Sequence, residues 1–74
     1  MEIVAKNLQA LRRARKLSRL AVAEAVQISE RSYQRYENDE REPSLPLFLA
    51  LADFYGVTLD QLAGRDPLPF GEDE

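Results

Sequence analysis

The sequence lacks both cysteine and histidine in all of its 74 residues. Disulfide bonds are therefore excluded, and so are the ligands of the usual zinc sites. An imidazole base and a thiol nucleophile are missing too, and the chain has neither a glycine-rich phosphate loop nor an H-E-x-x-H helix. We expect a protein that is not an enzyme and that uses no metal, cofactor or evident small-molecule effector.

Long apolar runs are absent as well. No stretch approaches the ~18 apolar residues of a membrane span, and the N-terminus has no signal-peptide pattern. With 45% hydrophobic and 31% charged residues, the chain has the composition of a soluble globular domain. We expect it in the cytoplasm, without a membrane partner.

The charges are distributed unevenly along the chain. Residues 1–42 carry nine basic and seven acidic side chains, whereas residues 43–74 carry one arginine and six acids, for a net charge of −3. This asymmetry favours a basic binding surface in the first part of the chain. The small excess leaves the nature of the partner open, because nucleic-acid-binding domains are often much more basic.

Hydrophobic spacing and capping residues predict an all-α domain of five helices. Four of them cover residues 2–16, 19–26, 30–37 and 45–55, and a fifth runs from the capping box T-L-D-Q at 58–61 to Gly64. Apolar stripes on the first, second and fourth helices are expected to face the core, while Leu20 looks exposed. These stripes are Val4, Leu8 and Leu11; Val22, Ala23 and Val26; and Leu45, Phe48, Leu49, Ala52 and Tyr55.

The predicted helix at 30–37 has two chemically different faces. Tyr33 and Tyr36 are three residues apart and share one face. Arg31 and Arg35 on the opposite face form a like-charge i, i+4 pair, which costs about 0.2–0.5 kcal/mol in an isolated helix. That face is therefore either a surface that reads a ligand or an ordinary solvated polar face. Its residues are Glu30, Arg31, Gln34 and Arg35.

Two short helices joined by residues 27–29 form a helix-turn-helix arrangement. Short motifs in a fixed order accompany it: L-x-x-L-R at 8–12, L-S at 17–18, V-A-E at 22–24, I-S at 28–29, Y-E-N at 36–38, R-E-P-S at 41–44 and Y-G-V-T-L-D-Q-L at 55–62. With this set, the sequence over about residues 6–64 resembles the phage-repressor-like helix-turn-helix family, the Cro and lambda-repressor type.

The resemblance implies a compact five-helix domain, assigned to residues 1–64, that binds near-palindromic double-stranded operator DNA as a homodimer. Such a protein regulates transcription, usually as a repressor, and places its third helix in the major groove. Arg12 and Glu37 would form a structural ion pair. The implied base-reading residues are Glu30, Arg31, Gln34 and Arg35. The implied phosphate contacts are Ser18, Arg19, Ser32, Asn38 and Arg41.

The chain departs from the family pattern at three positions. Gln27 stands in the turn where the family has glycine, so a left-handed backbone there would be strained. Arg19 replaces the usual glutamine at the start of the second helix, which favours a phosphate contact. Asp39 replaces the glycine after the third helix, and aspartate tolerates positive φ better than most residues.

Apolar residues towards the C-terminus are candidates for a dimer interface, with ordinary core positions as the alternative. Residues 65–74 contain two prolines and end in acids, so we expect an extended or disordered acidic tail there. The candidate interface residues are Phe54, Val57, Leu59, Leu62, Leu68 and Phe70.

A second class of function is open on the same fold, because a fold does not determine a function. A protein-interaction or antitoxin-like module is favoured by the net charge of −3 and by Glu30, whereas the arginines on and around the third helix favour DNA. Steep salt dependence of binding would distinguish the two, because a protein that neutralises phosphates releases counterions.

Overall fold

Five helices make up most of the described chain. The computed structural model describes residues 2–70, and this range contains no β-strand. The all-α, five-helix prediction is confirmed, and none of the described helices is long and apolar enough to cross a membrane. The helices are α1 (Glu2–Ala14), α2 (Arg19–Ala25), α3 (Glu30–Glu37), α4 (Leu45–Tyr55) and α5 (Leu59–Ala63).

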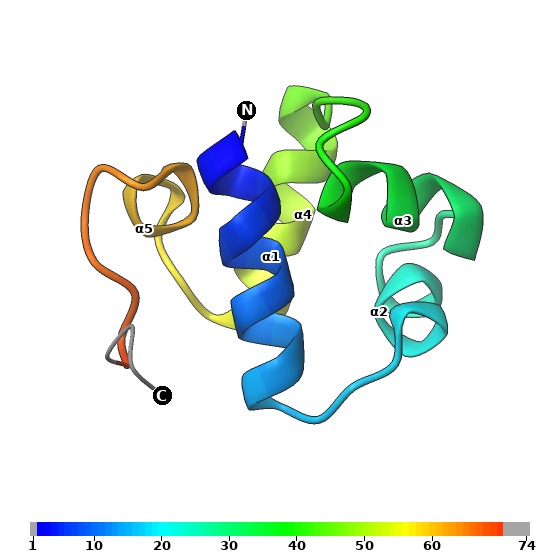
Figure 1. Ribbon diagram of the computed structural model, residues 1–74, viewed down its shortest axis with the longest axis horizontal. Helices are drawn as coiled ribbons and strands as arrows, with labels where there is room; N and C mark the ends of the chain where they lie inside the picture. Colours follow the sequence, from blue (N-terminus) through cyan, green and yellow to red (C-terminus); the bar gives the residue numbers. More distant parts are fainter. Residues whose placement is uncertain (1, 71–74) are drawn as a thin grey trace.

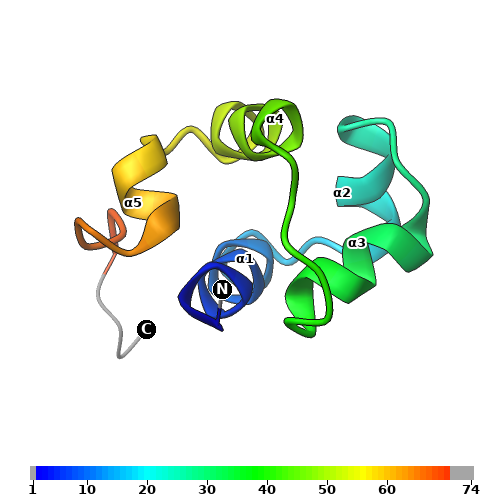
Figure 2. The same ribbon diagram turned by 90° about the horizontal axis from the view of Figure 1, so that it is seen from above.

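Helix α1 lies at the centre of the arrangement. Figure 1 shows it in front of α4, with α2 and α3 on one side and α5 on the other. Seen from above, α4 lies across from α1 (Figure 2), and α1 contacts both α3 and α5. Helices α2 and α3 pack against each other as the helix-turn-helix unit.

Polar side chains in and just after α1 bind the C-terminal carbonyls of three other helices. Asn7 donates to two carbonyls near the end of α5 at 3.1 and 3.0 Å. Gln9 donates to the last carbonyl of α3 at 2.7 Å. Arg15 donates to the last two carbonyls of α4, and its guanidinium group also stacks over the Tyr55 ring at the end of this helix. Because the last carbonyls of a helix have no partner within it, these bonds tie α3, α4 and α5 to α1.

Each helix from α2 to α5 begins at a hydroxyl residue. Ser18, Ser29, Ser44 and Thr58 each accept a hydrogen bond from the backbone N–H three residues further on, which satisfies one of the unpaired donors of the first turn. At α5, Gln61 also accepts from the backbone N–H of Thr58 at 2.9 Å. The predicted capping box is therefore confirmed.

A residue with a left-handed backbone follows the last residue of each helix by one or two positions. φ is 57° at Lys16, 63° at Gln27 and 59° at Asp39, and glycines follow α4 and α5 in the same conformation. The N–H of the next residue bonds to the carbonyl five positions earlier, after Gln27 at 2.9 Å. The strain expected at Gln27 is therefore present. Helix α1 ends at Ala14, not at the predicted residue 16, because Lys16 adopts this turn conformation.

The predicted stripes of the first two helices lie in the core, and Leu20 is exposed as expected. Val26 is partly buried and packs against the same core. The spacing identifies the buried face of α1 because exposed polar residues such as Lys6 and Arg13 lie opposite it. The fully packed members are Val4, Leu8, Leu11, Val22 and Ala23.

The core stripe predicted for α4 is wrong in part. Leu45 and Leu49 are 66% and 43% exposed, whereas Leu51, which was not in the predicted stripe, is fully buried. Because α4 is apolar on nearly every side, hydrophobic spacing does not identify its buried face. The predicted residues that do face the core are Phe48, Ala52 and Tyr55.

Two residues predicted for a dimer interface are core residues instead. Leu62 is fully buried and Val57 is 9% exposed, so neither is available to a partner at the surface. Leu68 and Phe70 pack against the same core, from the irregular segment that follows α5 (Figure 1). The end of the predicted tail, residues 71–74, lies outside the described residues.

Candidate nucleic-acid interface

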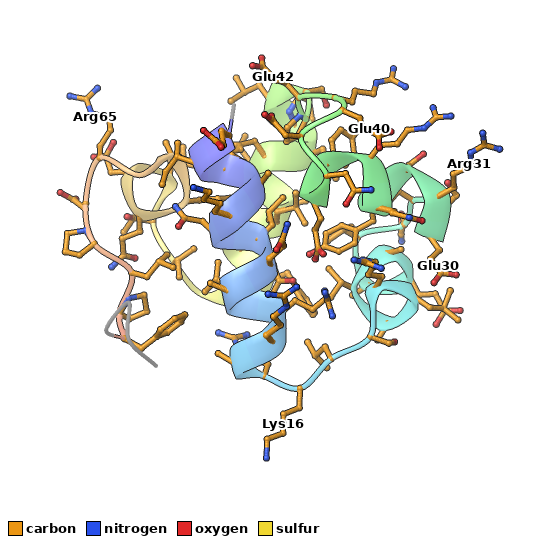
Figure 3. The ribbon with its side chains drawn as sticks, viewed as in Figure 1. Lys16, Glu30, Arg31, Glu40, Glu42 and Arg65 are labelled. Carbon is orange, nitrogen blue, oxygen red and sulfur yellow. The ribbon has the colours of Figure 1, made fainter. Side chains whose placement is uncertain are left out.

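Helix α3 has a buried inner face and an outer face that lies at the surface. The inner face consists of Tyr33, which is fully buried, and Glu37, which is 1% exposed. Figure 3 shows the side chains of Glu30 and Arg31 projecting from the outer end of α3, on the side of the molecule opposite Arg65. All four predicted base-reading residues therefore lie on one surface. This outer face consists of the exposed Glu30, Arg31 and Gln34 and the half-buried Arg35.

The outer face continues into the loop after α3. Arg31, Gln34, Arg35, Asn38 and Glu40 line an open hollow of about 170 Å³. Nδ2 of Asn38 donates to Oε2 of Glu40 at 3.4 Å. The residues that line this hollow thus carry two guanidinium groups, two amides and one carboxylate. Such a set can donate to base edges and phosphates and can accept from base edges. Sequence reasoning missed Glu40, because a loop position carries no periodic signal of the direction it faces.

The predicted phosphate contacts differ in how much of their hydrogen-bonding capacity the fold already uses. Asn38 and Arg41 are exposed after α3, and Arg19 is half-buried at the start of α2. The hydroxyl oxygen of Ser18 accepts the N–H of Ala21 at 3.0 Å, and that of Ser32 accepts from Ser29 at 2.9 Å. A hydroxyl that accepts in this way still has its O–H as a donor for an anionic ligand.

A buried carboxylate connects α1, α2 and α3. Arg12 donates to Glu37 twice, from Nε to Oε2 at 2.6 Å and from Nη2 to Oε1 at 3.1 Å. Arg19 donates from Nε to Oε1 of the same carboxylate at 3.2 Å. The three residues form what we call the Glu37 cluster. The Arg12–Glu37 pair, which the family resemblance implied, is present. Sequence reasoning missed Arg19 as a third member, because a separation of 18 positions leaves no local signal and the family pattern has glutamine in its place.

Two tyrosines extend the Glu37 cluster into the core. The hydroxyls of Tyr33 and Tyr55 are 2.9 Å apart, and burial raises the pKa of both phenols. Burial acts to raise the pKa of Glu37 as well, but hydrogen bonds from Arg12 and Tyr33 hold it below the ordinary 4.5. The Glu37 cluster is therefore ionised at neutral pH, with two cations, one anion and a net charge of +1.

Comparison with known proteins places these features in a family context. A family profile described as helix-turn-helix matches residues 8–62. The chain is 36% identical over 66 residues to the uncharacterized HTH-type transcriptional regulator YobD of Bacillus subtilis, covering 86% of this chain and 59% of the relative. It is also 36% identical over 60 residues to the HTH-type transcriptional regulator AnsR of the same organism, covering 81% and 52%. The chain thus spans little more than half the length of these relatives. No solved structure matches with comparable significance.

Proposed function

The chain belongs to the helix-turn-helix family, and from this premise we propose that it binds double-stranded DNA as a sequence-specific transcriptional regulator. Within the family we propose the phage-repressor-like type and the role of a repressor at a near-palindromic operator. Both relatives are named as transcriptional regulators, which supports the regulatory role. The observation that carries the proposal is the outer face of α3, where two arginines and a glutamine stand together outside the core.

In this proposal α3 enters the major groove and its outer face reads base edges. Arginine forks onto O6 and N7 of guanine, glutamine pairs with adenine, and a carboxylate such as that of Glu30 accepts from N4 of cytosine. Each well-formed bidentate pair contributes about 1–3 kcal/mol of discrimination between bases. The buried inner face supports this function, because its bonds to α1 and α4 hold α3 in one orientation.

The proposed phosphate contacts lie before, within and after the reading helix in the sequence. Ser18 and Arg19 precede it at the start of α2, Ser32 belongs to its first turn, and Asn38 and Arg41 follow it in the loop. Contacts of this kind position a protein on the duplex without reading its sequence. They also make binding weaken with salt, because each neutralised phosphate releases counterions.

Selection from a random duplex pool, followed by fluorescence anisotropy, tests the DNA-binding proposal. The wild type should enrich a short near-palindromic site and bind it much more weakly at about 200 mM than at about 50 mM salt. Arg31→Ala combined with Arg35→Ala should abolish this binding. Arg65→Ala, on the opposite side of the molecule (Figure 3), is the matched control and should bind like the wild type. Equal binding by wild type and double variant, or no binding by either, would overturn the proposal.

We also propose a homodimer, because two copies of α3 related by a two-fold axis match the two halves of a palindrome. Residues 1–64 form the proposed DNA-binding domain, and residues 65–74 its tail. The proposed contacts are Leu59, which is 39% exposed, and the half-buried Phe54, Leu68 and Phe70. Leu59→Asp should shift the sedimentation mass towards one chain, while Leu45→Asp on α4 should not. A wild-type mass of one chain at every concentration would rule out the dimer.

A protein-interaction module on the same fold is the second candidate function. Leu45 and Leu49 are exposed four positions apart on one side of α4, and they form an apolar surface for which DNA binding has no use. Glu30 on the outer face of α3 would also repel phosphate. This candidate takes precedence if neither the wild type nor the double variant binds any duplex.

A further inference from the structure

Arg19 occupies an unfavourable place for a cation. It is the first residue of α2, whose first turn contains no acidic residue, and the helix macrodipole disfavours a positive charge at this end. The carboxylate that offsets its charge comes from α3, where Oε1 of Glu37 lies 3.2 Å from Nε of Arg19. The presence of an arginine here therefore depends on a contact between the two helices of the helix-turn-helix unit.

Neutralising Glu37 does not require Arg19. Arg12 already binds both oxygens of Glu37, and its other terminal nitrogen donates to the carbonyl of Leu17 at 3.0 Å. Arg12 thus uses all three of its nitrogens inside the protein. The second guanidinium makes the Glu37 cluster net positive, and this surplus charge belongs to Arg19, whose side chain is 38% exposed against 13% for Arg12.

The guanidinium group of Arg19 is fixed at one end. Its Nε donates to the buried carboxylate, and the other four of its five N–H donors belong to the two terminal nitrogens. A planar fork that is already oriented loses little conformational freedom when it binds a phosphate. A lysine at the same position would have to reach both groups from one flexible nitrogen, so it would lack the oriented planar fork.

We propose that Glu37 is a positioning residue for DNA binding, and that it holds Nε of Arg19 so that the partly exposed terminal part of this guanidinium group meets a DNA phosphate. This inference rests on the proposed function. It assigns a part in DNA binding to a carboxylate that is itself inaccessible to DNA. Arg12 makes the arrangement possible, because it keeps Glu37 ionised independently of Arg19.

Arg19→Lys is the most informative variant, because it keeps the charge and removes the oriented fork. On the duplex obtained by selection, it should bind about tenfold more weakly than the wild type at fixed salt, because one charge-assisted hydrogen bond to the phosphate is lost. Arg19→Gln should bind at least as weakly, and its slope of log K against log salt should be lower by about one. Arg65→Lys and Arg65→Gln are the matched controls and should leave both quantities unchanged.

A double-mutant cycle tests the link to Glu37. Glu37→Gln keeps the size of the side chain but not its charge, and circular dichroism first shows whether this variant is folded. If Glu37 acts through Arg19, adding Arg19→Gln to Glu37→Gln should weaken binding by much less than Arg19→Gln does in the wild type. Fully additive losses would overturn the positioning role. If Glu37→Gln does not fold, the affinity of Arg19→Lys still shows whether the oriented guanidinium group contributes to DNA binding.

The remaining outcomes are distinguishable from a failure of the proposed function. Wild-type affinity in Arg19→Lys would overturn the inference and leave DNA binding intact. A lower melting temperature of Arg19→Lys with unchanged affinity of the folded protein would assign Arg19 to stability alone, which also overturns it. If the wild type shows no salt-dependent duplex binding, the proposed function itself has failed, and the inference fails with it.

Discussion

The inner and outer faces of α3 show two uses of charge on one helix of eight residues. On the inner face, Glu37 is buried and its carboxylate binds two arginines from two other helices. On the outer face, Arg31 and Arg35 form a like-charge pair outside the core, which by itself destabilises the helix slightly. The inner face therefore carries most of what α3 contributes to stability, and the outer face carries little. Changes on the outer face should cost only the proposed DNA binding, whereas changes at Glu37 should cost folding free energy first and, through Arg19, part of that binding.

The largest effect is expected from Glu37→Ala. It removes the buried anion and leaves Arg12 with a mostly buried charge and no carboxylate, which typically costs about 3–5 kcal/mol. That is a large share of the stability of a small domain. Urea unfolding followed by circular dichroism measures it, with Glu24→Ala at an exposed position of α2 as the control. A loss below about 1 kcal/mol would contradict the structural role of the Glu37 cluster.

Acid should weaken the same inner face by a smaller amount, because a protonated Glu37 still fills its place. Its pKa in the folded protein is below 4.5, so its charge contributes stability that is fully present above pH 4.5. This stability is lost as the pH falls through the lowered folded pKa. Urea midpoints of the wild type should therefore fall in acid more steeply than those of Glu37→Gln. Parallel curves would mean that other carboxylates govern the acid response.

Gln27→Gly should stabilise the protein by about 0.5–1 kcal/mol. The left-handed conformation costs a non-glycine residue about 1–2 kcal/mol, and the extra freedom of glycine in the unfolded chain offsets part of the gain. Thermal unfolding measures the change, and Gln34→Gly inside α3 is a control that should destabilise by about 1 kcal/mol. Unchanged DNA binding by Gln27→Gly would sharpen the separation between stability and recognition. A destabilised variant would show that the turn is not strained.

The smallest effect on stability is expected from Arg31→Ala combined with Arg35→Ala. Exposed substitutions usually change stability by less than about 0.5 kcal/mol, and removing the like-charge pair should contribute a slight gain. The urea midpoint should therefore stay near that of the wild type while DNA binding is lost. If this variant were destabilised as strongly as Glu37→Ala, the two faces of α3 would not differ in the way we describe.

Sequence reasoning located the helices well and the buried face of one helix badly. The starts of α2 to α5 follow from serine and threonine caps, and the stripe at Val4, Leu8 and Leu11 identifies the core side of α1. On α4 the same reasoning chose Leu45 and Leu49, which are exposed. Spacing identifies a buried face most clearly when the opposite face is polar, and α4 has only one charged residue, Asp53.

The candidate site divides in the same way. The outer face of α3 could be read from residues 30–37, because a helix places residues three and four positions apart on one side. The sequence does not predict that Arg19 joins the Glu37 cluster or that Glu40 lines the hollow. Both depend on how separate segments come together in space. Assigning Val57 and Leu62 to the surface failed for the same reason.

The local sequence sets where each helix begins and ends, because capping bonds and backbone dihedral preferences act over four to six residues. It also sets the chemistry that α3 presents on each side. Contacts between helices and loops determine which apolar side of α4 is buried. They also determine which cations bind Glu37 and which side chains lie beside the outer face. These contacts depend on the packing of the whole core, because each helix can bury its apolar surface and pair its buried charges only against the other helices.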